Sequence, residues 1–140
     1  MEKASVRILL VDDFEPFRSM VSSMLEGQPG LQVVGLASDG PEAVKQGEML
    51  QPDLILLDIG LPKLNGIEAA QQIRLVSPQS IILFLSANTS PDVARAALYT
   101  GARGYVLKVD VVAELLTAVD AVLMGKQFLS RRFAHNCLIC

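Results

Sequence analysis

The chain has 140 residues, of which 51% are hydrophobic and 19% are charged, and its formal net charge is −3. This length suits one well-buried domain, and the composition is typical of a folded globular protein and not of a disordered tail. A weakly acidic chain lacks the global basic field that nucleic-acid binding by the chain itself requires.

The amino end reads MEKAS and continues directly into an apolar run, without the hydrophobic region and cleavage site of a secretory leader. The apolar runs have strand length and are too short to cross a membrane. We therefore expect a cytoplasmic protein that makes no membrane contact.

Apolar runs alternate with helical patterns along the whole chain. The five runs are Val6–Val11, Leu31–Ala37, Leu54–Leu57, 81–85 and 105–107. After each run, hydrophobic residues recur at three- and four-residue intervals, as one face of a helix requires. Nearly continuous apolar strands are typical of a parallel sheet buried on both faces. Five rounds of strand then helix predict an α/β fold, an open sheet of five parallel strands with helices on both faces.

The alternation predicts a single domain over residues 1–126. Residues 127–140 fall outside it, and we interpret them as a carboxyl-terminal tail or the start of a linker to an output domain not present in this chain. Cys137 and Cys140 lie in this segment beside His135. A zinc site takes four ligands of this kind, and the chain has no other Cys or His, so a metal role is disfavoured.

Polar residues follow the apolar runs at the points where the expected strands end. These residues are Asp12 and Asp13 after the first run, Asp58 after the third, Ser86 after the fourth and Lys108 after the fifth. The carboxyl ends of parallel strands meet at one edge of the sheet, where open α/β proteins bind their ligands. We therefore expect the five side chains to lie close together.

The grouping of these residue types indicates phosphoryl transfer. Clustered carboxylates repel one another and stay ionised only if a cation lies among them. Mg²⁺ suits an open cluster, because it prefers one or two carboxylates plus water and phosphate oxygens. Such an ion leaves Asp58 as an oxygen nucleophile for a phosphoryl group. Lys108 then offers positive charge to a phosphoryl oxygen, and Ser86 offers a hydroxyl donor.

Each of these residues also has a simpler explanation when it is taken alone. Asp12 and Asp13 are suited to capping the following helix, and Asp58 is suited to opening a turn. Lys108 is suited to a solvated surface, and Ser86 to capping a loop. Capping, turn or surface roles do not explain why all five residues fall at one edge of the sheet. A shared site for phosphoryl transfer explains it, so we favour that interpretation.

Four segments, ILLVDD, LILLDIGLPKLNG, LSA and GARGYVLK, resemble in order and spacing the receiver domain of bacterial two-component response regulators. The resemblance covers nearly the whole chain and implies a flavodoxin-like (βα)5 fold. The segment after GARGYVLK is similar to the NarL/FixJ subfamily, in which a receiver usually precedes a LuxR-type helix-turn-helix domain.

The resemblance implies a role for each residue at the sheet edge. Asp58 is the phosphoacceptor, and Lys108 is its lysine partner. Asp13 and Asp58 bind Mg²⁺ together with the backbone carbonyl of Gly60. Asp12 assists in binding the ion, largely through water.

The resemblance also implies a switch. Ser86 is the hydroxyl that turns toward the acyl phosphate, and Tyr105 is the aromatic residue that moves inward with it. We expect the change to be read out on the surface of residues 93–123. One departure is Val109, which follows Lys108 where receivers commonly carry a cis proline. A non-proline bond strongly prefers trans.

The partners implied are a sensor histidine kinase as phosphoryl donor and, as in many members of the family, a homodimer that forms on phosphorylation. DNA would be contacted only through an output domain absent from this chain. We expect a signalling domain and not a turnover enzyme, since it catalyses only its own phosphorylation and dephosphorylation.

Other functions remain open at this stage. The chain also fits a stand-alone receiver that acts by protein–protein contact. A Mg²⁺-dependent aspartyl phosphohydrolase would carry a general acid two residues after the nucleophile, where this chain has Gly60. A flavin binder would need a glycine- and hydroxyl-rich loop after the first strand, where Asp12 and Asp13 would repel a phosphate.

Overall fold

The computed structural model describes residues 5–133, so Cys137 and Cys140 lie outside the described residues. The strands are β1 (Val6–Val11), β2 (Leu31–Ala37), β3 (Leu54–Leu57), β4 (Ile81–Ser86), β5 (Gly104–Leu107) and β6 (Phe128–Leu129). The α-helices are α1 (Glu15–Glu26), α2 (Gly40–Leu50), α3 (Gly66–Val76), α4 (Pro91–Tyr99) and α5 (Val111–Leu123). Two short 3₁₀ helices are η1 (Lys108–Asp110) and η2 (Arg131–Phe133).

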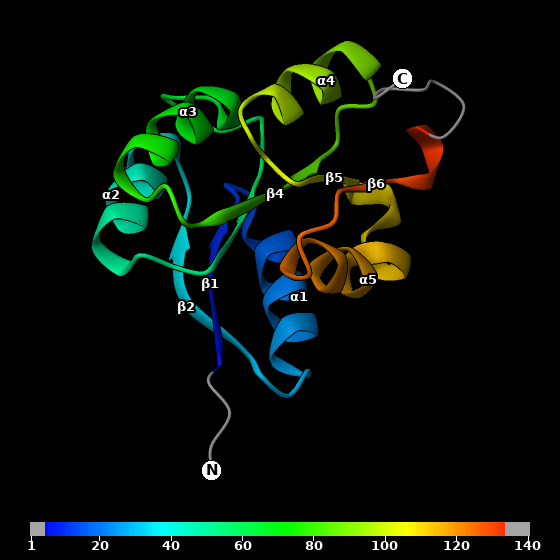
Figure 1. Cartoon of the computed structure of the whole chain (residues 1–140), viewed down its shortest axis with the longest axis horizontal. Coiled ribbons are helices and arrows are strands. Elements are labelled where there is room, and N and C mark those ends of the chain that lie inside the picture. The colour runs from blue at the N-terminus through cyan, green and yellow to red at the C-terminus, as the bar shows by residue number, and fades with distance from the viewer. Residues whose placement is uncertain (1–4, 134–140) are drawn as a thin grey trace.

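All six strands form one parallel sheet in the order β2-β1-β3-β4-β5-β6 (Figure 1). Strands β3 and β5 are buried along their whole length, which explains their continuous apolar sequence. Neighbouring strands end close to one another. Val11 pairs with Leu57 and Ser86 with Leu107, each the last residue of its strand, and Leu57 pairs with Phe84, two residues before the end of β4. The residues that follow these strands are therefore brought to one edge.

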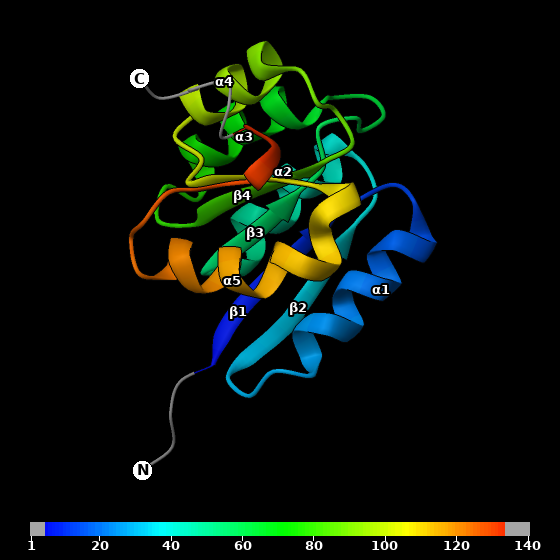
Figure 2. The same cartoon turned by 90° about the vertical axis from the view of Figure 1, so that its right-hand side faces the viewer.

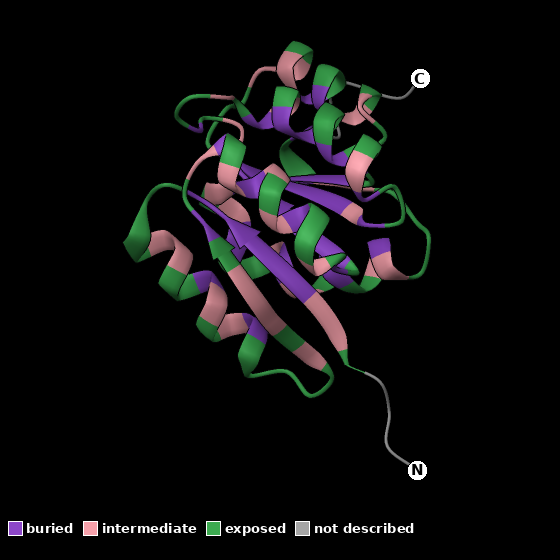
Figure 3. Ribbon diagram, turned by 90° about the vertical axis from the view of Figure 1, so that its left-hand side faces the viewer, coloured by how far each residue is buried: buried purple, intermediate pink, exposed green. Residues whose placement is uncertain are grey.

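Helices cover both faces of the sheet, as expected. Helices α1 and α5 lie on one face, and α2, α3 and α4 lie on the other (Figures 1 and 2). Leu25 and Leu115 belong to the hydrophobic cluster on the first face, and Ala43, Ile73 and Ala97 belong to the cluster on the second. Figure 3 shows the buried strands between helices whose outward faces are exposed. The sheet is thus a rigid platform with its carboxyl edge free of helices.

Three helices begin with a capping side chain in the loop that follows a strand. Asp39, Asn65 and Ser90 each accept a hydrogen bond from the backbone N–H three residues further on. Such caps satisfy one of the unpaired N–H groups of a first helical turn. They fix where α2, α3 and α4 start, and therefore fix the loops that surround the carboxyl edge.

The expected number of strands, five, is wrong, because β6 adds a sixth parallel strand beside β5. Gly104 pairs with Phe128 and Tyr105 with Leu129. The strand has only two residues, too few to show a pattern in the sequence, and it satisfies backbone groups that β5 would otherwise expose at the sheet edge. The assignment of residues 127–140 to a tail or linker stays a prediction, and within that segment residues 128–133 pack on the sheet.

Among residues 5–133, no helix combines the length and the apolar character that crossing a bilayer requires.

Candidate functional site at the carboxyl edge of the sheet

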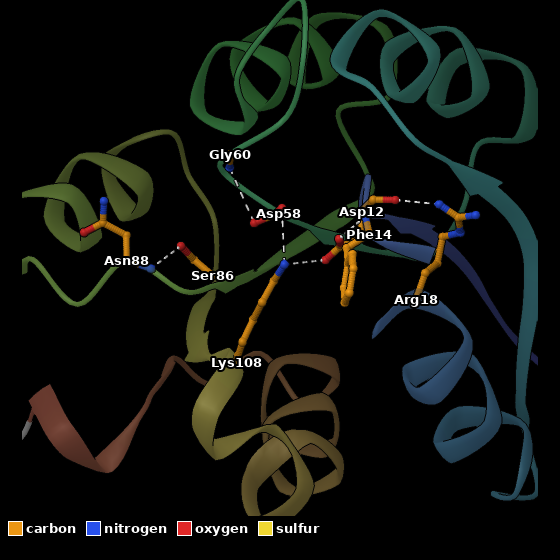
Figure 4. A network of polar contacts seen from close by, with 8 residues as sticks. All are labelled: Asp12, Phe14, Arg18, Asp58, Gly60, Ser86, Asn88 and Lys108. Carbon is orange, nitrogen blue, oxygen red and sulfur yellow. Dashed lines mark hydrogen bonds and ion pairs between the residues drawn. The ribbon is translucent and has the colours of Figure 1, made fainter. Parts of the chain in front are cut away.

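The structure brings the predicted site residues together at the carboxyl ends of the strands (Figure 4). Four of them, Asp58, Gly60, Ser86 and Lys108, border an open pocket of about 440 Å³. Its lining residues are Asp58, Ile59, Gly60, Ser86, Ala87, Asn88 and Lys108. The pocket thus contains the three residues to which the sequence assigns catalysis, and the small Ala87 lies beside the predicted switch hydroxyl.

Three acidic residues form a cluster beside this pocket. Carboxylate oxygens of Asp12, Asp13 and Asp58 all lie within 4.8 Å of one another. Asp12 and Asp58 are buried, with 1% and 6% of their surfaces exposed, whereas Asp13 is exposed. Hard oxygen donors grouped at an open, partly solvated edge fit Mg²⁺, which keeps several waters when it binds.

Asp12 is held by the start of α1. The backbone N–H of Phe14 donates to Asp12 Oδ1 at 2.9 Å, and Arg18 Nη1 donates to the Asp12 backbone oxygen at 2.7 Å (Figure 4). The residue at the capping position of α1 is Phe14, whose side chain makes no capping bond. Neither Asp12 nor Asp13 therefore caps this helix, and the simpler explanation of the acidic pair does not hold.

Lys108 reaches from the start of η1 into the acidic cluster. Its Nζ lies 2.7 Å from Asp12 Oδ2 and 3.3 Å from Asp58 Oδ2. Burial alone would lower the pKa of Lys108, but the two carboxylates outweigh it and hold the pKa above its usual value. No cis peptide occurs within residues 5–133, so the bond to Val109 is trans, as predicted.

The electrostatic balance around Asp58 leaves its negative charge incompletely compensated. Burial raises the pKa of Asp58 above its usual value, Lys108 counteracts part of this, and the charge of Asp12 adds to the rise. The backbone N–H of Gly60 approaches Asp58 Oδ1 at 3.4 Å. A ligand role for the Gly60 carbonyl stays a prediction.

Ser86 and Tyr105 are connected through the backbone of Asn88. The Asn88 N–H donates to Ser86 Oγ at 3.0 Å, and the Tyr105 hydroxyl donates to the Asn88 carbonyl at 2.8 Å. Tyr105 is fully buried, so its ring points inward in this structure. Burial raises the pKa of Tyr105, which keeps its hydroxyl protonated as a donor near neutral pH.

Two contacts at the site were not predicted. The Phe17 ring lies under the Lys108 ammonium, with Nζ 4.6 Å from the ring centroid, within the range of a cation–π interaction. The sequence placed Phe17 only on the hydrophobic face of its helix. Asp13 precedes the N-terminal cap of α1 and therefore shares no helix face with Phe17, so no local pattern in the sequence marks this contact.

The second contact is at Gly66, the first residue of α3. Its N–H donates to the Ile59 carbonyl at 2.7 Å. A β-carbon at this position would overlap the backbone oxygen of Asp58 and lie 2.7 Å from the Ile59 α-carbon. Only glycine allows α3 to start this close to the main chain of the predicted phosphoacceptor.

The strand order and the residues at the sheet edge place the chain in the class of flavodoxin-like α/β receiver domains. The response regulator receiver domain family matches residues 8–120, and the chain belongs to this family.

Known proteins agree with this assignment. The chain is 35% identical to the transcriptional regulatory protein DegU of Brevibacillus brevis over 95% of this chain and 56% of DegU. It is 39% identical to the nitrate/nitrite response regulator NarL of Escherichia coli K12, over 88% of this chain and 57% of NarL. A LuxR-family response regulator from Aurantimonas sp. SI85-9A1 has a similar structure, with a TM-score of 0.89, 35% identity and 94% of both chains covered. The chain therefore spans somewhat more than half the length of these two curated relatives.

Proposed function

We propose that the chain is a phosphorylation-activated receiver that accepts a phosphoryl group from a sensor histidine kinase on Asp58. The observation that carries the proposal is the position of this carboxylate. It is buried, borders the open pocket, belongs to the acidic cluster and lies 3.3 Å from the Lys108 ammonium. Its negative charge is therefore accessible and incompletely compensated.

In the proposed reaction, a carboxylate oxygen of Asp58 forms a bond to phosphorus. The bond between phosphorus and the kinase imidazole nitrogen breaks, and its electron pair returns to the imidazole. Lys108 Nζ lies close enough to Asp58 to shift onto a phosphoryl oxygen, and Ser86 Oγ lies on the same pocket wall. The ammonium offsets the negative charge of the transferred group, and the hydroxyl donates a hydrogen bond that orients it.

Mg²⁺ is the proposed cofactor, and Asp12, Asp13 and Asp58 are the residues that would hold it with the Gly60 carbonyl. The ion supplies positive charge for the carboxylate cluster and for a bound phosphoryl group. The geometry that supports this is the approach of the three carboxylates to one another. Lys108 alone leaves this cluster with more negative than positive charge.

The proposed output is transcription regulation through a DNA-binding domain outside this chain. The support is that DegU is described as a transcriptional regulatory protein and is longer than this chain. Phosphorylation-dependent homodimerisation and a cytoplasmic location are part of the same proposal. A stand-alone receiver would leave the chemistry at Asp58 unchanged.

We further propose that the chain is not a turnover enzyme and modifies only itself. The phosphohydrolase alternative needs a general acid two residues after Asp58, and Gly60 provides none. Within the described residues, no other carboxylate lines this pocket.

Incubation of the chain with Mg²⁺ and acetyl phosphate tests the proposal. The intact mass should increase by one phosphoryl group, and Asp58→Asn should abolish the increase. Asp120→Asn, at an exposed position of α5, is the matched control and should label normally. Labelling that persists in Asp58→Asn, or its absence from the wild type, would contradict the proposal.

A further inference from the structure

The Lys108 ammonium contacts an aromatic ring as well as two carboxylates. Its Nζ lies 2.7 Å from Asp12 Oδ2, 3.3 Å from Asp58 Oδ2 and 4.6 Å from the centroid of the Phe17 ring. Figure 4 shows the lysine side chain reaching the two carboxylates from the start of η1. The ring attracts the ammonium through its electron-rich face and adds no negative charge to the acidic cluster. The ammonium is therefore held by partners of two different kinds.

The start of α1 fixes the position of the Phe17 ring. Phe17 lies in the first turn of the helix, directly after Pro16, whose own ring presets a helical backbone. The Arg18 N–H donates to the Phe14 carbonyl at 3.0 Å, and Arg18 Nη1 donates to the Asp12 carbonyl at 2.7 Å. These bonds tie the first turn of α1 to the loop that carries the acidic residues. The ring therefore has a fixed place relative to Asp12.

Packing alone does not account for an aromatic residue at position 17. Phe17 is half-buried and packs against the hydrophobic cluster between the sheet and helices α1 and α5. Phe128 of β6 is also half-buried and packs against the same cluster, but it does not line the pocket at Asp58. An aliphatic side chain could fill such a position, but it would offer no attraction to the ammonium that lies over the Phe17 ring.

The two carboxylates that hold Lys108 also belong to the proposed Mg²⁺ site. Asp12 and Asp58, together with Asp13, offer oxygens within 4.8 Å of one another. With a cation there, Asp12 and Asp58 share their negative charge with it, and both ion pairs of Lys108 weaken. When Asp58 is phosphorylated, its carboxylate loses its charge because one oxygen is bonded to phosphorus. Mg²⁺ takes oxygen ligands, so the attraction between the Phe17 ring and the ammonium is not lost in the same way.

We propose that Phe17 is a positioning residue for Lys108, and that its ring keeps the ammonium at the pocket when a cation or phosphorylation takes up the charges of Asp12 and Asp58. This inference rests on the proposed function. Phe17 acts on Lys108 and makes no contact with the reacting carboxylate in this role. With the ring in place, the ammonium stays available to a phosphoryl oxygen. Without the ring, the flexible four-carbon stem of the lysine lets the ammonium move into solvent.

NMR spectroscopy of the full chain with ¹³C-labelled lysine tests the position of Lys108. Protons above the face of an aromatic ring are shifted upfield, so the Hε signal of Lys108 should be shifted upfield in the wild type, with and without Mg²⁺. In Phe17→Leu this shift should be absent, and the Lys108 side chain should become more mobile when Mg²⁺ is added. Lys108→Met assigns the signal, and the exposed Lys126 is the internal reference.

Two results of the NMR experiment would overturn the proposal. In the first, the wild type loses the upfield shift of Lys108 when Mg²⁺ is added, which means that the ammonium has left the ring. In the second, the Lys108 side chain of Phe17→Leu stays as rigid in Mg²⁺ as that of the wild type, which means that the ring is not needed to hold it.

The rate of labelling by acetyl phosphate measures the consequence for the reaction. With Mg²⁺, Phe17→Leu should accept the phosphoryl group about two- to fivefold more slowly than the wild type, which is the range of a cation–π interaction at a partly exposed site. Phe128→Leu makes the same change in a residue of the same hydrophobic cluster and should label at the wild-type rate. Labelling of Phe17→Leu at the wild-type rate, or an equal loss in Phe128→Leu, contradicts the proposed role.

Fluorinated phenylalanines at position 17 separate attraction from packing. Fluorine withdraws negative charge from the ring face and changes the shape of the ring little. Replacing Phe17 with trifluorophenylalanine should therefore slow labelling as much as Phe17→Leu does, and monofluorophenylalanine should give an intermediate rate. If the trifluorinated protein labels at the wild-type rate, the ring acts by packing alone and the proposal is wrong.

The mass of the wild type distinguishes failure of this inference from failure of the proposed function. If the wild type gains one phosphoryl group and Phe17→Leu gains it equally fast, only the role of Phe17 is refuted. If the wild type gains no phosphoryl group, the proposed function fails, and the role of Phe17 in the reaction fails with it.

Discussion

The two edges of the sheet use polar residues in opposite ways. At the amino edge, Ser77 Oγ and Ser80 Oγ lie 2.7 Å apart, and Ser80 Oγ donates to the Pro52 carbonyl at 2.5 Å. Arg7 Nη1 donates to the backbone oxygens of Leu50 and Gln51 at the end of α2. These groups bond to neutral partners within the fold, so they need no ligand.

The carboxyl edge is left electrostatically incomplete. Two of the three clustered carboxylates, Asp12 and Asp58, share the ammonium of Lys108, and the pKa of Asp58 is raised mainly by burial. Charges buried without full compensation reduce the stability of a fold. The comparison indicates that the amino edge contributes stability, whereas the carboxyl edge holds excess negative charge at some cost to stability, as the proposed binding of a cation would require.

The largest effect should come from removing the ammonium that pairs with Asp12 and Asp58. Lys108→Met leaves Asp12 and Asp58 buried with no positive partner, and should lower the free energy of unfolding by about 3 kcal/mol. Mg²⁺ should restore part of this loss, because it returns positive charge to the carboxylates. Urea denaturation with and without Mg²⁺ measures both effects.

Lys126→Met, at an exposed position, is the control for Lys108→Met and should unfold like the wild type. An unchanged stability of Lys108→Met, or a loss that Mg²⁺ does not reduce, would show that the carboxylates are not under strain from their own charge.

A smaller effect is expected at the amino edge. Ser80→Ala leaves the buried Pro52 carbonyl and Ser77 hydroxyl short of a partner, and should lower the free energy of unfolding by about 1–3 kcal/mol. The loss should be independent of Mg²⁺, and labelling by acetyl phosphate should remain normal. Ser23→Ala on the exposed side of α1 is the control. If the loss of unfolding free energy in Ser80→Ala depended on Mg²⁺, the two edges of the sheet would not differ in the way described.

The smallest effect concerns Asp39, a carboxylate near the carboxyl edge that has its own partners. The Glu42 N–H donates to it at 2.8 Å, and Lys63 Nζ lies 3.3 Å away. The hydrogen bond is the main reason that the pKa of Asp39 lies below its ordinary value of 3.8. Its stabilising contribution is therefore present above that value and is lost as the pH falls through the depressed folded-state pKa.

Asp39→Asn keeps an oxygen acceptor for the helix cap and removes the charge. Thermal unfolding between about pH 4 and about pH 2 should thus depend less on pH in Asp39→Asn than in the wild type. If thermal unfolding depended equally on pH in the two proteins, the charge of Asp39 would not stabilise the fold, and Asp39 would not differ from the carboxylates of the site.

Much of the fold and of the site could be predicted from the sequence, because both depend on strand ends. A buried parallel strand is a continuous apolar run, and the residue after it must lie at the carboxyl edge. Asp12, Asp58, Ser86 and Lys108 were assigned to the site on this ground alone, and the structure places them there. Their roles in phosphoryl transfer remain predictions that the labelling experiment tests.

Contacts between segments far apart in sequence could not be predicted. Strand β6 has two residues and forms because the edge of β5 offers unpaired backbone groups, which no local pattern reveals. The hydrogen bond from Ser130 to Glu114 forms only because the chain turns back along β5 after α5 ends. The packing of Phe133 on Tyr105 in turn depends on the position of β6 and on that hydrogen bond. The cation–π contact of Phe17 was missed because a residue on an apolar helix face gives no sign of a charged neighbour.

Because Gly66 lies so close to the main chain of Asp58, the site requires a residue without a side chain at position 66 as well as charged residues around the pocket. Adding a single methyl group there would push either α3 or the main chain of Asp58 out of position, with no charged residue altered. A genetic screen for inactive variants would therefore recover Gly66 beside the acidic residues and the lysine. Its tolerance to substitution is set by the space between two backbone segments and not by the reaction that they support.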